Sequence, residues 1–274
     1  MTALSLSPQV AALLARFVEE QTGLYYGDEN QDLFIDKLSR RAALAGFDSA
    51  LEYYYFLRYD PAGEAELGAL IDALVVGETY LFREVDQLRV LVDEMIAPAV
   101  AAGRRPRIWS AACATGEEPL TLAMLLGQRG LGDRVELVAS DVSQAALERA
   151  RRGALTRRAL RNGCPPGYER WVGAEANGSV WVSPELLASI SWRRVNLVNA
   201  PEVRALGRFD AILCRNVLIY FTDSTARRVI EALHEALDPG GFLLVGASES
   251  LLRLGTLLSC EEHGGAFFYR KVAA

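Results

Sequence analysis

The segment Arg107–Leu120, RIWSAACATGEEPL, constrains the fold more than any other part of the chain. It is typical of a buried strand that breaks into a turn of small residues and then opens a helix. Glu117, Glu118 and Pro119 stand in the first helical turn, where acids and proline are favoured. A pyrophosphate site would need bare N–H groups and more glycine. The two carboxylates therefore indicate a ligand with hydroxyl groups and positive charge, unless the turn is an ordinary strand-to-helix connection.

A second apolar run, Val135–Asp141, ends in an acid and precedes the helical pattern SQAALERAR. Asp141 lies beyond the first turn at about the spacing, roughly 20 residues, at which dinucleotide-type folds place a carboxylate on ribose hydroxyls. It could equally cap the helix that follows. Together the acids favour a ligand that combines a ribose, an amine and a sulfonium, as S-adenosylmethionine does.

Two further strands are expected, at Phe209–Cys214 before the segment RNVLIYF and at Gly241–Gly246 after the turn Asp238–Gly241. Strands that alternate with helical patterns predict an α/β fold with a mostly parallel, doubly wound, Rossmann-like sheet. Ligands of such sheets bind at the carboxyl ends of the strands.

The first part of the chain, residues 1–82, is predicted to be a separate domain made only of helices. Ser7-Pro8 starts the first helix, which ends near Gly23. Three more helices are expected at Gln31–Ala45, Ser49–Arg58 and Glu64–Val76.

A linking helix, Glu84–Ala101, and a polar segment occupy residues 83–106, and the α/β domain takes residues 107–274. Within it, about residues 153–194 are rich in glycine, proline and tryptophan. Trp171-Val172 and Val180–Val182 flank a polar turn, so we expect a small antiparallel β subdomain there.

Composition excludes several classes of protein. The chain has 274 residues, of which 51% are hydrophobic, enough for one large domain and a smaller companion. A net charge of −6 and an isoelectric point near 5.2 give no basic field, so no nucleic-acid partner is expected. There is no basic leader and no apolar run near the roughly 18 residues that span a bilayer. The scattered cysteines predict free thiols and no metal site in a cytoplasmic protein: Cys113, Cys164, Cys214 and Cys260.

Five motifs occur in the order of a known family. They are GETYLFRE (77–84), RIWSAACATGEEPLTLA (107–123), ASDVS (139–143), CRNVLIYF (214–221) and LDPGGFLLVGASES (237–250). They resemble the CheR-type chemotaxis-receptor glutamate O-methyltransferases, and the resemblance covers nearly the whole chain. It implies methyl transfer from S-adenosylmethionine to glutamate carboxylates of chemoreceptor-like proteins, with S-adenosylhomocysteine as product. The expected enzyme is a monomer that acts on the cytoplasmic domain of its receptor.

The resemblance also implies a set of cofactor contacts: Gly77, Thr79, Arg83, Glu117, Asp141, Asn196, Leu197, Arg215 and Asn216. Glu117 would pair with the ammonium group, Asp141 would accept the ribose hydroxyls, and Asn196 would read the adenine edge. Glu118 competes with Glu117 for the first of these roles. Asn196 could instead form the turn after a short strand.

Arg83 and Tyr220 are the predicted catalytic residues. Arg83 would hold one oxygen of the substrate carboxylate, and Tyr220 would hydrogen-bond beside the reacting centre. The alternatives are an interdomain ion pair for Arg83 and plain packing for Tyr220.

Two basic groups are candidates for receptor contact, although such faces are often only solvated. The first, on one helix, comprises Lys37, Arg40 and Arg41. The second comprises Arg149, Arg151, Arg152, Arg157, Arg158 and Arg161. In related enzymes the antiparallel insert can also dock a receptor tail.

The chain departs from the family at four places. Gly77 stands where asparagine is common, Leu81 where phenylalanine is, and Leu155 where tyrosine is, and Ala112–Ala114 replaces a turn that usually contains serine. Gly77 lacks an amide that would lie near the cofactor, which predicts weaker binding. Two alternatives therefore stay open: a module that binds the cofactor without turnover, and a methyltransferase with another acceptor.

Overall fold

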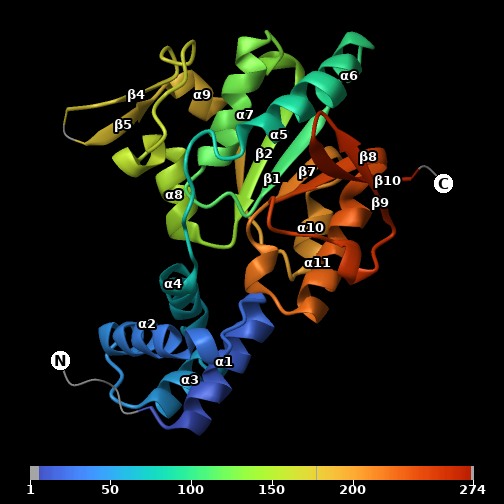
Figure 1. Ribbon diagram of the computed structural model, residues 1–274. Coiled ribbons are helices and arrows are strands. Elements are labelled where there is room, and N and C mark those ends of the chain that lie inside the picture. The colour runs from blue at the N-terminus through green and yellow to red at the C-terminus, as the bar shows by residue number, and fades with distance from the viewer. Residues whose placement is uncertain (1–5, 177, 273–274) are drawn as a thin grey trace. The chain divides into compact units, whose positions relative to one another are not determined.

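The computed structural model describes residues 6–176 and 178–272. The prediction that the chain has no leader concerns Met1–Ser5 in part, and these residues lie outside the described ranges. The chain forms two compact units (Figure 1). One contains the residues up to Val76 together with Tyr220–Thr225, and the other contains Gly77–Ile219 and the residues from Ala226 onward.

The first unit is helical, as predicted. Its elements are α1 (Pro8–Thr22), η1 (Asp28–Asn30), α2 (Gln31–Leu44), α3 (Ala50–Tyr59) and α4 (Gly63–Leu74). The Ser7 hydroxyl accepts the N–H of Val10 at the start of α1, and Gly23 ends that helix in the left-handed conformation with φ of 80°. Buried side chains from all four helices form the core, among them Leu14, Leu38, Tyr53 and Leu70. Apolar residues at helical spacing therefore face one another, which stabilises helices that would be marginal alone.

The second unit is built on a seven-stranded sheet with the order β6-β2-β1-β7-β8-β10-β9. Its strands are β1 (Arg107–Ala111), β2 (Glu136–Asp141), β6 (Ile190–Arg194), β7 (Phe209–Cys214), β8 (Leu237–Val245), β9 (Leu258–His263) and β10 (Ala266–Lys271). The first five strands in this order pair in parallel, whereas β10 pairs antiparallel with β8 and β9. The parallel part has the doubly wound strand order, in which the chain starts at the centre and the order reverses beside β1. The predicted α/β class is therefore confirmed.

Helices precede and connect these strands. They are α5 (Val85–Val90), the π-helical segment η2 (Leu91–Ile96), α6 (Ala97–Ala101), α7 (Glu117–Gln128), α8 (Gln144–Arg151), α10 (Ala200–Ala205) and α11 (Asp223–Ala236). Short 3-10 turns are η3 (Gly132–Arg134), η5 (Leu218–Tyr220) and η6 (Leu252–Leu254). The predicted linking helix thus exists, but its middle turn is π-helical.

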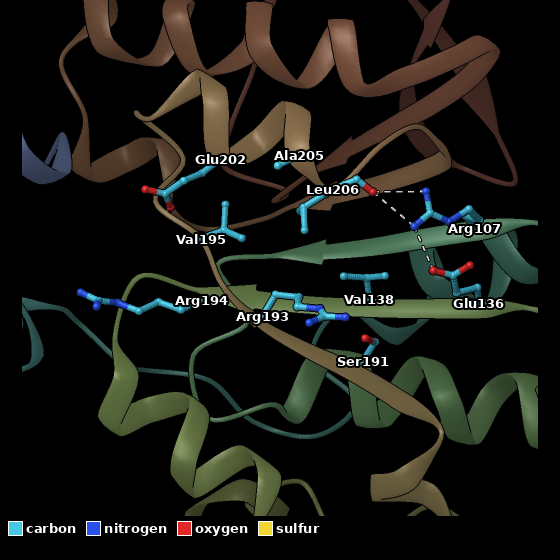
Figure 2. Close-up of a pocket in the computed structure, with 10 residues that line it drawn as sticks. All are labelled: Arg107, Glu136, Val138, Ser191, Arg193, Arg194, Val195, Glu202, Ala205 and Leu206. Carbon is cyan, nitrogen blue, oxygen red and sulfur yellow. Dashed lines mark hydrogen bonds and ion pairs between the residues drawn. The ribbon is translucent and has the colours of Figure 1, made fainter.

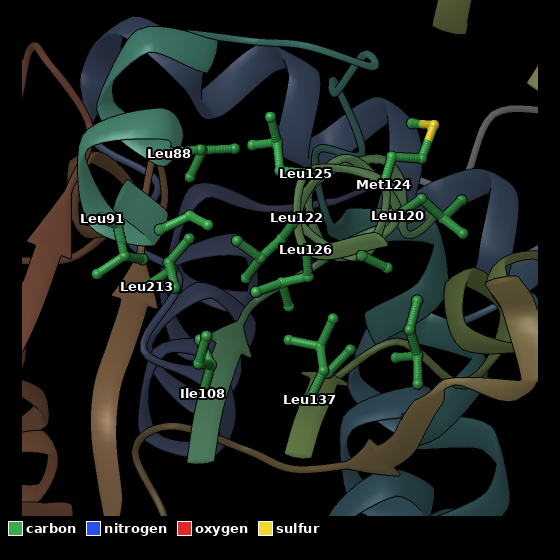
Figure 3. Packing of buried hydrophobic residues seen from close by; sticks show 14 of the residues in the cluster. Leu88, Leu91, Ile108, Leu120, Leu122, Met124, Leu125, Leu126, Leu137 and Leu213 are labelled. Atoms are coloured by element: carbon green, nitrogen blue, oxygen red, sulfur yellow. The ribbon is translucent and has the colours of Figure 1, made fainter. Parts of the chain in front are cut away.

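Helix α7 is covered on nearly every side, because each residue from Pro119 to Leu126 is buried. Figure 3 shows its leucines between Leu88 and Leu91 of the linking helix and the strand residues Ile108 and Leu137. Trp109, which alternates with Ile108 on β1, and its cross-strand partner Ile212 on β7 are fully buried too, so the opposite sheet face is also covered. This packing fixes the start of α7 relative to the sheet, and the first turn of α7 carries the two acids.

The segment Asp238–Gly241 is not a separate turn before the fourth strand. It lies inside β8, where Leu237 pairs with Phe209 but Phe242 already pairs with Ala211. The residues between them bulge out of the ladder, and Gly240 adopts φ of 81°. Proline and glycine favour an irregular backbone at Asp238–Gly241, but these residue types are common in both bulges and turns, so the sequence did not distinguish the two.

The predicted antiparallel insert is present as a three-stranded sheet of order β3-β5-β4. Its elements are β3 (Leu155–Thr156), η4 (Arg157–Leu160), β4 (Val172–Ala174), β5 (Ser179–Val182) and α9 (Pro184–Ala188). The strand Ile190–Arg194, which the sequence grouped with this insert, is instead β6 at the edge of the main sheet, parallel to β2. The predicted insert, about residues 153–194, therefore includes one strand of the main sheet.

No helix in the described part of the chain is long and apolar enough to cross a membrane. The four cysteines are free thiols, with Cys113 and Cys214 buried. Burial raises the pKa of both of these thiols well above its usual value, which makes them unreactive at neutral pH.

Candidate active site

A pocket of about 650 Å³ lies beside the carboxyl end of β1, at the start of α7. Three predicted cofactor contacts line it, namely Gly77, Thr79 and Glu117. Its other lining residues are Glu78, Thr115, Arg149, Thr156, Arg158, Ala159 and Arg161. The pocket thus combines an acid from the first turn of α7 with arginines from α8 and the insert. Such a mixed lining suits a zwitterionic ligand.

Gly116 shapes the turn that brings Glu117 to this pocket. It has φ of 94°, and a Cβ there would lie 2.9 Å from both Ala150 Cβ and a ring carbon of Trp192. Only glycine fits, because any side chain would push α7 away from α8 and β6.

The two neighbouring acids of this turn have different surroundings. Glu117 is only 4% exposed, lines the pocket, and accepts the hydroxyl proton of Thr115 at 2.7 Å. Burial raises its pKa, although the Thr115 hydrogen bond and Arg149 partly offset the rise. Glu118 points to Ser110 and Arg215, which donate to its two carboxylate oxygens at 2.7 and 2.8 Å. Glu117 is therefore the acid that is free to meet a cation, and Glu118 is a structural partner.

Arg215, a predicted cofactor contact, is held by acids of the protein itself. Its side chain is 2% exposed, and its Nη atoms contact Glu84 and Glu118 at 2.8 Å each. Nη2 also donates to the Arg83 carbonyl at 3.3 Å, whereas Nε lacks a hydrogen-bond partner. Burial lowers the pKa of Arg215, but the two carboxylates outweigh it and the net shift is upward. This ion triad fastens the segment before α5 to the end of β7 and the start of α7.

Asp141 stands at the carboxyl end of β2, as predicted. Its two carboxylate oxygens accept the backbone N–H groups of Ala114 and Ser143, at 2.8 and 2.9 Å. The helix cap that the sequence left open belongs to Ser143, whose hydroxyl accepts the N–H of Ala146. Asp141 therefore ties the turn after β1 to the loop after β2 and lies beside the cofactor turn.

Asn196 and Leu197 follow β6, and the backbone there is joined to β2 by a hydrogen bond from Val195 to the Asp141 carbonyl, at 3.1 Å. The Asn196 carbonyl oxygen of the side chain accepts the N–H of Val198 at 3.3 Å. The side chain thus does form a local turn, which was the alternative for this residue. The adenine role of Asn196 stays a prediction.

Arg83 lies just before α5, and its guanidinium donates to the Glu78 carbonyl at 3.2 Å and lies 3.9 Å from Glu84. Neighbouring residues fasten this segment to the rest of the unit. The N–H of Leu81 donates to the Ala159 carbonyl at 2.9 Å, and that of Phe82 donates to the Thr121 hydroxyl at 3.0 Å. Arg83 is thus anchored within its own unit, and its catalytic role stays a prediction.

Left-handed backbone conformations gather around these segments. Among the described residues other than glycine they occur at Phe82, Glu84, Ala112, Ala114 and Asn216. Each lies before α5, in the turn after β1, or directly after β7. Such conformations cost about 1–3 kcal/mol each and persist where the surroundings impose them, commonly at ligand sites. Their common location supports the assignment of the site.

Three of the positions at which the chain departs from the family lie either beside the pocket or in the hydrophobic core. No atom lies within 4 Å of a Cβ built on Gly77, so the side chain that is missing there leaves open space beside the pocket. Leu81 and Leu155 are 1% and 3% exposed and belong to the core. The apolar replacements are therefore part of the packing, and only Gly77 changes the pocket.

The remaining predicted residues lie in the helical unit. The Tyr220 carbonyl accepts the N–H of Tyr25 at 2.8 Å, and burial together with Tyr220 raises the pKa of Tyr26 to about 12. Lys37 donates to the Leu74 carbonyl at 3.0 Å, and Arg41 donates to Glu66 at 2.7 Å. Two of the three cations on α2, Lys37 and Arg41, therefore already have partners within the helical unit.

Arg40 alone of these three is exposed, and its partner is Asp36 of the preceding turn of α2. In the second basic group, Arg149, Arg158 and Arg161 line the pocket. Arg161 also lies over the Tyr80 ring, 3.6 Å from its centroid.

A second pocket, of about 360 Å³, lies over β2 and β6 near α10 (Figure 2). The Arg107 guanidinium in this pocket already donates hydrogen bonds to the carbonyls of Leu206 and Arg208 and to the Glu136 carboxylate. None of the described residues that line this pocket is a predicted site residue, so it does not alter the assignment.

The doubly wound sheet and a ligand pocket beside the carboxyl end of β1 define a Rossmann-like enzyme that binds a nucleotide-type cofactor. A buried acid where a phosphate cradle would otherwise stand points to a cofactor that carries positive charge. A family model described as CheR methyltransferase, SAM binding domain, matches residues 77–263, and one described as CheR methyltransferase, all-alpha domain, matches residues 11–75. The chain belongs to the CheR methyltransferase family. It is an S-adenosylmethionine-dependent methyltransferase, as the motifs predicted.

Curated relatives cover nearly the whole chain. A chemotaxis protein methyltransferase of Vibrio parahaemolyticus is 37% identical over 263 residues, which are 93% of this chain and 94% of that protein. Chemotaxis protein methyltransferase 2 of Vibrio cholerae is 36% identical over 87% of this chain and 84% of its own length. Chemotaxis protein methyltransferase 1 of Pseudomonas aeruginosa is 33% identical over 87% and 89%.

Proposed function

We propose that this enzyme methylates glutamate side chains in the cytoplasmic domain of chemoreceptor-like, methyl-accepting proteins. Relatives of nearly equal length are named chemotaxis protein methyltransferases, which supports this class of acceptor. The observation that carries the proposal is the pocket lined by Glu117, Gly77 and Thr79, in a chain that belongs to the CheR family. The enzyme acts in the cytoplasm as a monomer and has no nucleic-acid substrate.

The pocket fits S-adenosylmethionine. Glu117 is a buried carboxylate with one hydroxyl partner and can receive the ammonium group of the cofactor. Asp141, at the end of β2, accepts the N–H of Ala114 in the same turn, and we assign it the ribose hydroxyls. When bound, the cofactor supplies an electrophilic methyl group on its sulfonium.

The reaction needs no general base from the protein. A glutamate carboxylate has a reference pKa of about 4.3 and is ionised at neutral pH. The protein therefore acts by orienting the two reactants and by excluding water. Arg83 holds one carboxylate oxygen of the substrate and leaves the other free to attack. Tyr220 stabilises the reacting carboxylate by a hydrogen bond.

Of the three candidate receptor contacts on α2, we retain Arg40. Lys37 and Arg41 are bound within the helical unit, and burial also lowers the pKa of Lys37. The exposed guanidinium of Arg40 is available to an acidic receptor helix, since an exposed pair with Asp36 is weak.

The test is a transfer assay with tritiated S-adenosylmethionine on membranes that contain the receptors of the same organism. Methyl incorporation that base releases as methanol is expected, because esters hydrolyse in base whereas N-methyl groups do not. Base-stable incorporation would show another acceptor group. Binding of S-adenosylhomocysteine without transfer to any receptor would favour a regulatory module.

A further inference from the structure

Glu249, in the loop after β8, joins two loops at the edge of the sheet where the cofactor residues gather. Its Oε2 accepts the backbone N–H groups of Gly246 and Asn216, each at 2.7 Å, and its Oε1 accepts that of Leu218 at 2.8 Å. One carboxylate thus satisfies three backbone donors from two loops that follow the neighbouring strands β7 and β8.

These bonds act on a residue with an unusual backbone. Asn216 has φ of 59°, a left-handed conformation that asparagine tolerates at some cost. A charge-assisted hydrogen bond to its N–H is stronger than a neutral one and counteracts that cost. The contact to Leu218 N–H fixes the first residue of η5, the turn that ends at Tyr220.

Gly246 completes the arrangement. A Cβ at this position would lie 2.5 Å from Asn216 Nδ2 and 2.9 Å from Glu249 Oε2. Any side chain would displace the Asn216 amide or the Glu249 carboxylate. The loop after β8 is therefore shaped around these two groups.

We infer that Glu249 is a positioning residue of the methyltransferase site, because it holds the backbone that presents the Asn216 side chain to the cofactor. This role rests on the proposed function in that Asn216 serves as a cofactor contact. Glu249 acts through Asn216 and does not touch the ligand.

The test measures the dissociation constant of S-adenosylhomocysteine by calorimetry for Glu249→Gln. Glutamine keeps the shape but turns one acceptor oxygen into an N–H₂ donor, which then faces a backbone N–H. We expect the dissociation constant to rise at least about tenfold, equal to about 1.4 kcal/mol. Glu262→Gln is the matched control, because Glu262 is an exposed glutamate of β9, and it leaves the constant unchanged.

A double-mutant cycle separates positioning from general support of the fold. In an Asn216→Ala background, Glu249→Gln should have little further effect on the dissociation constant. Additive effects, or a lower melting temperature with unchanged binding by the folded fraction, would overturn the inference.

Gly246→Ala provides a second route if Glu249→Gln does not fold. It keeps the Glu249 side chain but presses on the Asn216 amide and on the Glu249 carboxylate, so the same rise is expected, and an unchanged constant would again overturn the inference. These readouts do not need a receptor. If the wild type binds S-adenosylhomocysteine but methylates no receptor, the proposed function fails while the binding measurements still decide the role of Glu249.

Discussion

Replacing Arg215 by methionine should destabilise the enzyme strongly even in the absence of a cofactor. The side chain is 2% exposed and bridges Glu84 and Glu118, whose side chains are only 26% and 14% exposed. Methionine fills most of the volume but leaves Glu118 without its cation and Glu84 with only the more distant Arg83, 3.9 Å away. Removing one partner from a buried ion pair costs about 3–5 kcal/mol, because the other charge stays desolvated.

The expected loss of unfolding free energy for Arg215→Met lies at the lower end of that range. Glu84 keeps some access to water and a backbone donor at Ala247, so part of its charge stays solvated. A loss of about 3 kcal/mol corresponds to roughly 6–12 °C in melting temperature, at about 2–4 °C per kcal/mol for a chain slightly below this size. The assay is urea unfolding followed by circular dichroism, together with a thermal melt. Arg89→Met is the control, since its partner Asp86 is an exposed neighbour on the same helix, and it should cost less than about 0.5 kcal/mol.

Adding Glu118→Gln to Arg215→Met should restore part of the loss, since one uncompensated charge disappears. A loss for Arg215→Met below about 1 kcal/mol, or one equal to that of Arg89→Met, would refute the argument. Arg215 would then be free to serve a ligand, as its predicted cofactor role requires.

Three other substitutions test the site. Glu117→Gln should weaken S-adenosylhomocysteine binding about tenfold or more, since a charge-assisted hydrogen bond contributes about 1.5–3 kcal/mol, while the unliganded protein melts no lower, because a raised pKa means that the buried charge is unfavourable. In the wild type the raised pKa of Glu117 predicts that cofactor affinity falls as the pH drops towards this pKa, at a higher pH than for an ordinary glutamate. It also predicts that Glu117 destabilises the unliganded fold as the pH rises through the same pKa. Calorimetry and melting curves from pH 5 to 8 would contradict both predictions if affinity and melting temperature stayed constant. Gly77→Asn should tighten binding by about 2- to 13-fold, the equivalent of one hydrogen bond of about 0.5–1.5 kcal/mol, because its Cβ meets open space; weaker binding in the same titration would count against a missing contact. Asp141→Ala should weaken binding, whereas Tyr220→Phe should slow methyl transfer with binding nearly unchanged, and an equal loss of binding in both would mean that the two roles are wrongly assigned.

Much of the fold was predictable from local patterns. Helix α1 begins after Ser7-Pro8 and ends at Gly23 because these residues act on their own neighbours, whatever the rest of the chain does. The runs Arg107–Ala111 and Phe209–Cys214 are buried on both faces of the sheet and therefore read as continuous apolar strands. The family motifs placed the cofactor segments at the carboxyl ends of these strands.

Strand partners were not predictable in the same way. Ile190–Arg194 looks like another strand of the insert, but it pairs with β2 at the edge of the main sheet. The insert joins β3 to β5 instead, across more than 20 residues of sequence. Pairing depends on which edge is free in the folded molecule, and the sequence pattern of a short strand does not contain that information.

The sequence by itself determined the kind of chemistry: an acidic turn after the first strand, an acid after the second, and motifs that identify a methyltransferase. Only the tertiary structure decided between the adjacent acids, because Glu118 lies against Arg215 and Ser110 and leaves Glu117 to the pocket. It also revealed Glu249, whose three backbone partners come from two separate loops. Local patterns report the conformation of a segment, but the surroundings of a side chain depend on residues that are distant in sequence, and those surroundings set its charge, partners and role.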